Sequence, residues 1–378
     1  MVNQVLRKTV EVIAANGSES TNVKPSMAQP LAVRCHAILA LLVAGYLGGG
    51  IVTAQSLGVP ERMTLARLSI IYPAIGVLAV LALFHAFSRR RTAIVPSRRP
   101  NESSGGRRGL GEFLPSPSQL LVAVPTALLM ILLVQAFGSF KTMIPLIHSY
   151  QYWDAEFAAW DEFLHGGIQP WRLIQPFVGY PAVTWALNAI YYFLWFPLLL
   201  VMLLWQCFDM RRPILRLQFL FTFAIAWILL GSLAATVFSS AGPCYYGAVT
   251  GLDDPFVPLI EYLNRANDSY PLLALTVQDR LWQFYKENVF VQGAAISAMP
   301  SLHVAMAFLF ALIGWSVNRY LGMVLGVFTV LIQVGSVHLG WHYAIDGYAS
   351  IMSIWAIWKI VGYLLVRGAA QPRRSEGA

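Results

Sequence analysis

Long apolar stretches follow one another along this 378-residue chain and leave few ways for it to fold. They lie at about 31–53, 66–87, 119–137, 182–207, 217–238, 298–317, 320–338 and 343–366. A hydrocarbon core about 30 Å thick requires roughly 20 apolar residues from each helix that crosses it. Only helices and closed barrels satisfy their backbone in lipid, and these runs lack the alternation of barrel strands. The sequence therefore predicts an all-α, polytopic transmembrane helical bundle with about eight spans.

Composition divides the chain into five segments. Hydrophobic residues make up 57% of the chain and charged residues 12%, so the polar segments stand out. We expect a cytoplasmic polar N-terminus (1–30), two N-terminal transmembrane helices (31–87), a basic linker (88–118), a membrane-embedded domain (119–367) and a cytoplasmic tail (368–378). The linker is rich in Ser, Gly, Pro and Arg, which is typical of a disordered segment.

Arginine clusters indicate which loops face the cytoplasm, because short cytoplasmic loops carry an excess of basic residues. Basic side chains crowd the loops after the second and fourth predicted spans: Arg89, Arg90, Arg91, Arg98, Arg99, Arg107, Arg108, Arg211, Arg212 and Arg216. The loops at about 138–181 and 239–297 are net acidic, so we expect them on the periplasmic or extracellular side. Membrane orientation and anionic headgroups thus explain the formal net charge of +8, and no nucleic-acid partner is expected. A bacterial inner membrane is the simplest location.

Two short polar islands interrupt the apolar sequence. The first is Met299-Pro300-Ser301-Leu302-His303, and the second is His342-Tyr343-Ala344-Ile345-Asp346. Each opens a hydrophobic stretch, where ionisable side chains are costly and are seldom present without a function. Proline suits the first turn of a helix, and the free N–H groups of that turn can bind a phosphate. We therefore expect Ser301 to contact such a phosphate and His303 to stand beside it.

The second island pairs a histidine with a carboxylate. His342 and Asp346 are four residues apart, so on one helix they share a face and the carboxylate can reach the imidazole. A carboxylate that holds Nδ1–H leaves Nε2 as the basic atom, which suits a nucleophilic or proton-transferring histidine. Since the span between the islands makes one return crossing, both islands should lie at the same outer face.

At these residues the chain resembles a known family. The segments Pro300-Ser301-Leu302-His303 and 342–346 are similar to the second and third signature motifs of the type-2 phosphatidic acid phosphatase superfamily, membrane enzymes that pass phosphate through a phosphohistidine. The likeness is closest to the inositol phosphorylceramide synthase branch, in which Leu precedes the first histidine and no Ser-Arg pair opens the third motif. Gly335 and Ser336 stand at that pair's place, and 242–246 resembles a Pro-and-aromatic loop of the same branch.

The resemblance implies a fold and a mechanism. The fold is a six-helix phosphatase-type core, which would make 119–367 the catalytic domain. In the mechanism His342 attacks phosphorus, Asp346 orients it, and His303 protonates the leaving alkoxide and later deprotonates the acceptor. No metal or other cofactor is needed. The superfamily's first motif, a lysine six residues ahead of Arg-Pro, is absent in working form, so Arg280 and Lys286 are our candidate phosphate-binding cations.

Three functions remain open from the sequence. The first is a lipid phosphotransferase that moves a phosphate or an inositol phosphate-like headgroup from a phospholipid donor to a lipid or alcohol acceptor at the outer membrane face. The second is a phosphatase acting on phosphatidic acid or polyprenyl phosphate with the same residues, and the third is a transporter or structural membrane protein. Among other polar residues, Asp161 and His165 suggest either a metal site or, as we prefer, the acidic face of an interfacial helix.

Overall fold

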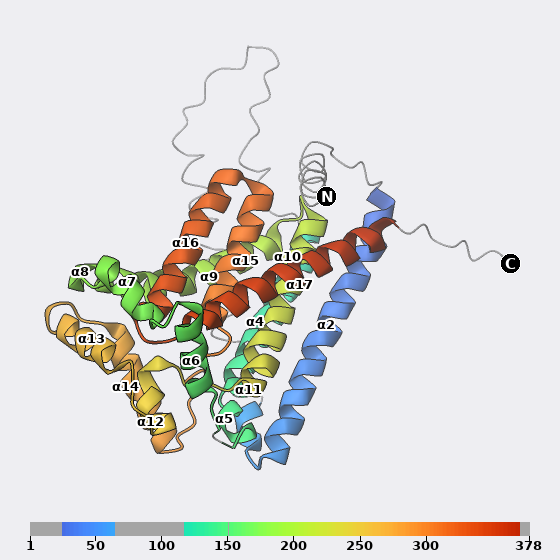
Figure 1. Ribbon diagram of the computed structural model, residues 1–378. Helices are drawn as coiled ribbons and strands as arrows, with labels where there is room; N and C mark the ends of the chain where they lie inside the picture. The colour runs from blue at the N-terminus through green and yellow to red at the C-terminus, as the bar shows by residue number, and fades with distance from the viewer. Residues whose placement is uncertain (1–24, 65–116, 150, 371–378) are drawn as a thin grey trace, which may run out of the picture.

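The computed structural model describes residues 25–64, 117–149 and 151–370 (Figure 1). The predicted span at 66–87 lies outside the described residues, as do most of the predicted N-terminal segment, most of the linker and most of the tail. Within the described part the chain is helical and forms no named strand; a single isolated bridge joins Val291 to Ala294.

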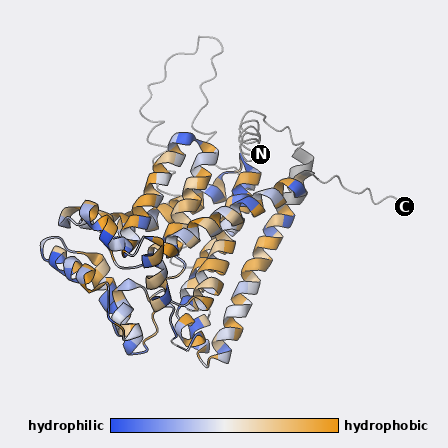
Figure 2. Ribbon diagram, in the orientation of Figure 1, coloured by the Kyte–Doolittle hydropathy of each residue, from blue (hydrophilic) through white to orange (hydrophobic). Residues whose placement is uncertain are grey.

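Six helical segments in the described residues are long and apolar enough to cross a membrane, which confirms the all-α polytopic bundle. They are α2 (Pro25–Ser56), α4 (Pro117–Lys141), α8 (Pro181–Ala189) continued by η3 (Ile190–Leu194) and α9 (Trp195–Phe208), α10 (Pro213–Ile228) continued by η4 (Leu229–Ala234) and α11 (Ala235–Val237), α16 (Arg319–His338) and α17 (Ala344–Ala370). Figure 2 shows that these helices are mostly hydrophobic along their length, whereas hydrophilic residues gather at their ends.

Helix α15 (Leu302–Val317) is the buried centre of the bundle. Most of its side chains are buried, and at 1.5 Å per residue it is roughly 24 Å long, which is shorter than the hydrocarbon core. Its partner α16 packs closely along it, because a Cβ on Gly322 would meet the Trp315 side chain at 2.5 Å. The start of this helix lies inside the bundle, since Ser301 and Val304 are fully buried.

Short helices gather at one end of the bundle. They are η1 (Pro60–Met63), α5 (Ile144–Ile147), α6 (Asp154–Leu164), α7 (Pro170–Val178), η5 (Pro243–Tyr245), α12 (Tyr246–Thr250), α13 (Val257–Ser269) and α14 (Leu273–Lys286). Figure 1 places α5, α11 and α12 at this end and the turn between α15 and α16 at the opposite end. Helices α15 and α17 both begin toward the end that carries the short helices, so both polar islands lie on that side.

The N-terminal span packs against the rest of the bundle, and polar contacts at two places along it are part of this packing. Near one end, Nη1 of the buried Arg216 lies 3.0 Å from Nε2 of His36 on α2. Further along α2, the Tyr46 hydroxyl lies 2.6 Å from Oγ of Ser232 in the π-helical segment η4. Helix α2 is therefore part of the folded bundle.

Candidate functional site

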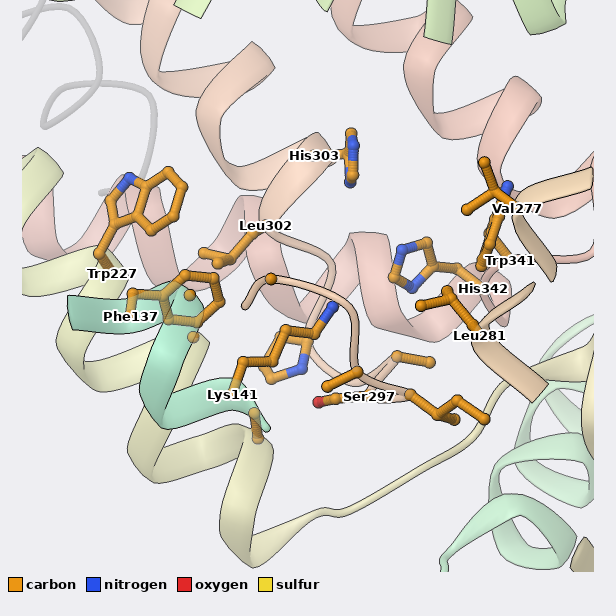
Figure 3. Close-up of a pocket in the computed structure, with 18 of the residues that line it drawn as sticks. Phe137, Lys141, Trp227, Val277, Leu281, Ser297, Leu302, His303, Trp341 and His342 are labelled. Carbon is orange, nitrogen blue, oxygen red and sulfur yellow. The ribbon is translucent and has the colours of Figure 1, made fainter. Parts of the chain in front are cut away.

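A cavity of about 420 Å³ joins the two polar islands. Its polar and aromatic lining comes from several elements, and includes Lys141 from the end of α4, Tyr191 from η3, Trp195 from α9, His303 from α15 and His342 from the connection before α17. Figure 3 shows His303, His342 and Lys141 around the same space. The return crossing between the islands thus brings the two histidines together, as the sequence predicted.

His342 and Asp346 form the expected pair. Nδ1 of His342 lies 3.1 Å from Oδ2 of Asp346, which is fully buried in the first turn of α17. The same oxygen accepts the backbone N–H of Tyr343 at 3.2 Å. On the other side, the carbonyl of Ser336 accepts the backbone N–H of His342 at 3.2 Å. Both the ring and the backbone of His342 are thereby held, with Nδ1 rather than Nε2 turned toward the carboxylate.

Burial keeps the His342 imidazole neutral. It lowers the pKa of this residue to about 3, and the positive charge of Lys141 acts in the same direction, whereas a hydrogen bond with the backbone of Ala298 opposes them. A neutral imidazole retains the lone pair that a nucleophile needs. His342 is therefore in the reactive protonation state near pH 7.

Aromatic rings hold His303 on the opposite wall. Its ring stacks on Tyr191, with centroids 4.4 Å apart, and lies 4.2 Å from the ring of Trp195. The Trp195 indole N–H also donates to the His303 carbonyl at 3.0 Å. These aromatic residues lie where a π-helical segment meets an α-helix, an irregularity that is frequent at functional sites. Contact with Tyr191 and Trp195 holds the His303 ring in a fixed orientation at the cavity wall.

Ser301 has a structural contact in the described site. It is fully buried, it is the N-cap of α15, and its Oγ accepts the backbone N–H of Val304 at 3.4 Å. Ser301 is not among the residues that line the cavity, whereas its neighbours Pro300 and Leu302 are. The structure therefore places this hydroxyl beneath the site, at the start of the helix that carries His303.

We expect Ser301→Ala to lower stability with little change in substrate binding. Loss of an N-cap typically costs about 1 kcal/mol of unfolding free energy. Thermal unfolding in detergent would measure the first effect, and KM would measure the second. A KM raised by about tenfold or more with unchanged thermal stability would instead support the phosphate contact that we expected from the sequence, since tenfold corresponds to one lost interaction of about 1.4 kcal/mol.

The cations of the site differ from those that sequence reasoning selected. Arg280 and Lys286 lie on α14 with exposed side chains, and neither lines the cavity. Lys141 does line it, from the last residue of α4 (Figure 3). One sequence signal could have identified Lys141: it ends an apolar span and opens a net acidic loop.

Helix α6 turns two of its acidic side chains into the protein, where we had expected the acidic face of an interfacial helix. Asp154 and Asp161 are both buried, and their carboxylates accept hydrogen bonds from backbone N–H groups. Burial raises the pKa of Asp161 to about 6, although bonds from Ala344 and Ile345 favour its charged form. The oxygens of both carboxylates are thus bound by N–H groups of the protein. His338, also fully buried, contacts the Thr184 hydroxyl through Nε2 at 2.8 Å and is outside the cavity lining.

Comparison with known proteins gives a family match. A family model described as the PAP2 superfamily matches residues 155–360, which is more than half of the chain. The matched range contains both histidines, the buried Asp346 and Asp161, and all of α7 to α16. Searches of curated proteins and of solved structures found no match to this chain.

Proposed function

The chain belongs to the PAP2 superfamily, and from this premise we propose that it is an integral membrane lipid phosphotransferase that works through a phosphohistidine. The observation that carries the proposal is the His342–Asp346 pair, held at 3.1 Å on the wall of a cavity that it shares with His303 and Lys141. A buried nucleophile, a group that can carry a proton and a cation around one space are the parts that phosphoryl transfer requires.

The first half of the reaction forms the phosphoenzyme. Nε2 of His342 attacks phosphorus of the donor phospholipid, the bond from phosphorus to the leaving alkoxide breaks, and His303 donates its proton to that alkoxide. Asp346 accepts Nδ1–H throughout, which stabilises the positive charge that develops on the ring of His342. The products of this half are an alcohol and a phosphorylated His342.

The second half transfers the group to an acceptor. His303, now neutral, removes a proton from the acceptor hydroxyl, whose oxygen attacks phosphorus as the bond to Nε2 breaks. His303 regains its proton and His342 its lone pair, so the enzyme is restored. We assign Lys141 to the phosphate oxygens in both halves, because its side chain reaches the cavity that contains both histidines (Figure 3).

The apolar walls of the cavity favour transfer to an organic acceptor over hydrolysis. Phe137, Trp227 and Leu302 belong to the main hydrophobic core of the bundle. Tyr245, Leu281 and Ile296 belong to a separate cluster built from the loops and α14. All six line the cavity, and Figure 3 shows the first three and Leu281 on opposite sides of it. Two apolar walls offer room for the apolar parts of a donor and of an acceptor, whereas water needs neither.

The finer assignment follows from the sequence motifs. We propose that the transferred group is an inositol phosphate-like headgroup, because Leu302 before His303 and Gly335-Ser336 resemble the inositol phosphorylceramide synthase branch. We place the reaction at the periplasmic or extracellular side of a bacterial inner membrane, because the loops around the site are net acidic. A phosphatase with the same residues is the second candidate, since water can replace the alcohol in the second half of the reaction.

Purified full-length protein in phosphatidylcholine vesicles would test the proposal. The vesicles would contain either phosphatidylinositol or phosphatidic acid, each ³²P-labelled in its phosphate, with and without ceramide as the acceptor alcohol. A new labelled phospholipid that requires the added alcohol is the expected result. Labelled inorganic phosphate from phosphatidic acid, or labelled inositol phosphate from phosphatidylinositol, without any new phospholipid would overturn the transferase in favour of a hydrolase. No turnover of either lipid and no labelled protein would overturn phosphohistidine chemistry on these phospholipids.

A further inference from the structure

Helix α6 holds the residues between His342 and Asp346 without lining the cavity itself. Asp154 and Asp161 are seven residues apart, which is about two helical turns, so both carboxylates lie on one face of α6. Both are buried, and each accepts hydrogen bonds from a segment far away in the sequence. A buried carboxylate is costly unless its oxygens have such partners, and here they do.

Asp161 caps the helix that carries Asp346. Its two oxygens accept the backbone N–H groups of Ala344 at 2.6 Å and Ile345 at 3.0 Å, the first two residues of α17. A carboxylate at this position satisfies two otherwise unpaired donors and interacts favourably with the positive end of the helix. The next residue along the helix is Asp346. The position of the Asp346 carboxylate against His342 is therefore tied to Asp161.

Asp154 holds the remaining residue of the segment. Its Oδ1 accepts the Tyr343 hydroxyl at 2.8 Å and the backbone N–H of Gly242 at 2.8 Å, while Oδ2 accepts the backbone N–H of Ala241 at 2.8 Å. Gly242 also lies against the site, because a Cβ there would meet the Trp341 carbonyl oxygen at 2.6 Å. The carboxylate thus connects the 240–242 loop to the residue that follows His342.

We propose that Asp161 and Asp154 are positioning residues that keep Asp346 in hydrogen-bonding register with His342. Together they contact Tyr343, Ala344 and Ile345, which are all the residues between the nucleophile and its carboxylate. The ring of Phe157, on the same helix, packs against the ring of Tyr343 with centroids 6.1 Å apart, which adds an apolar contact between α6 and this segment. The inference rests on the proposed function, because it concerns the rate at which His342 reacts.

Asp161→Asn is the principal test, with Glu156→Gln as its matched control. Glu156 lies on the same helix with an exposed side chain. Its substitution by Gln therefore replaces a carboxylate with an amide, as Asp161→Asn does, at a position outside the contact with α17. Displacing a reacting group by about 1 Å can cost about 100-fold in rate. We expect Asp161→Asn to lower kcat by about 10- to 100-fold with KM within about twofold of the original protein, because ground-state binding is unaffected. The control should match the original protein.

A double-mutant cycle separates positioning from general support of the fold. If Asp161 acts through Asp346, the variant with both Asp161→Asn and Asp346→Asn should have the same kcat as Asp346→Asn alone, because coupled residues are not additive. If the fold-losses in kcat of the two single variants instead multiply in the double variant, the two residues act independently and the inference is wrong. Formation of labelled phosphohistidine in vesicles with ³²P-labelled phosphatidylinositol or phosphatidic acid, whichever lipid the original protein turns over, supplies the rate.

Tyr343→Phe covers the case in which Asp161→Asn does not fold. It removes one hydroxyl from a buried ring and leaves every charge in place. We expect kcat to fall by about three- to tenfold, which corresponds to one lost hydrogen bond of about 1 kcal/mol. Thermal stability should fall by no more than the loss of this one hydrogen bond explains. If His342→Ala is inactive but Asp161→Asn or, where that fails to fold, Tyr343→Phe has the original kcat, the positioning inference is wrong and the proposed function stands. An active His342→Ala would overturn the proposed function first.

Discussion

His342→Ala is expected to abolish turnover together with the labelled phosphoenzyme. In the proposed mechanism, Nε2 of the His342 imidazole supplies the lone pair that forms the bond to phosphorus. The alanine side chain has no nucleophilic atom to replace it. Removal of a catalytic nucleophile typically costs about 10⁴-fold or more, so activity should fall to background. The measurement is incorporation of ³²P from the labelled phospholipid into protein. Acid treatment then identifies the linkage, because acid hydrolyses the N–P bond of a phosphohistidine and releases the label.

A matched histidine supplies the control for this experiment. His148 is half-buried at the end of α5 and does not line the cavity, so His148→Ala should retain the phosphoenzyme and the turnover rate. Thermal unfolding of both variants checks that they remain folded. Full activity in His342→Ala would contradict the mechanism, whatever the behaviour of the control.

Lys141→Met is expected to have the second largest effect. Methionine is close to lysine in length but carries no charge, so the substitution removes the cation and preserves most of the packing. Loss of one group that stabilises transition-state charge typically costs about 100- to 1,000-fold, and we expect kcat/KM for the labelled phospholipid to fall by that amount. Lys141→Arg should recover part of the loss, because the positive charge is restored with different geometry.

Substitution of the two exposed cations on α14 should have little effect on catalysis, in contrast to Lys141→Met. Arg280→Ala and Lys286→Ala should leave kcat/KM within about twofold, because exposed charges outside a cavity contribute little to it. A large loss in either variant, with Lys141→Met unchanged, would restore the phosphate-binding assignment that we made from the sequence and would remove Lys141 from the site. Steady-state kinetics on the four variants decides between the two sets.

Local sequence patterns predicted the membrane class and the contact between His342 and Asp346. Apolar runs are a direct consequence of the hydrocarbon core, so seven of the eight predicted spans correspond to helices in the described residues, and the eighth lies outside them. The pairing of His342 with Asp346 follows from a four-residue spacing, since both side chains lie on one turn of the chain. Spacing of this kind needs no knowledge of the rest of the fold.

The residues that sequence reasoning missed act across long separations. Asp161 is 183 residues from Ala344, and Asp154 is 189 residues from Tyr343. An acidic pair on a short helix has the same local pattern whether it faces solvent or a buried helix end, so we assigned it to the surface. The choice of Arg280 and Lys286 over Lys141 has the same origin: closeness in sequence to Ser301 was taken as closeness in space.

The sequence by itself determined the class of this protein and the pairing of His342 with Asp346, because bilayer thickness and helical periodicity act on neighbouring residues. Tertiary structure alone decided what surrounds them: Lys141 on the cavity wall, Tyr191 and Trp195 against His303, and the two carboxylates of α6 behind His342. These contacts depend on how helices from distant parts of the chain pack, and a buried charge finds its partner only where that packing places one.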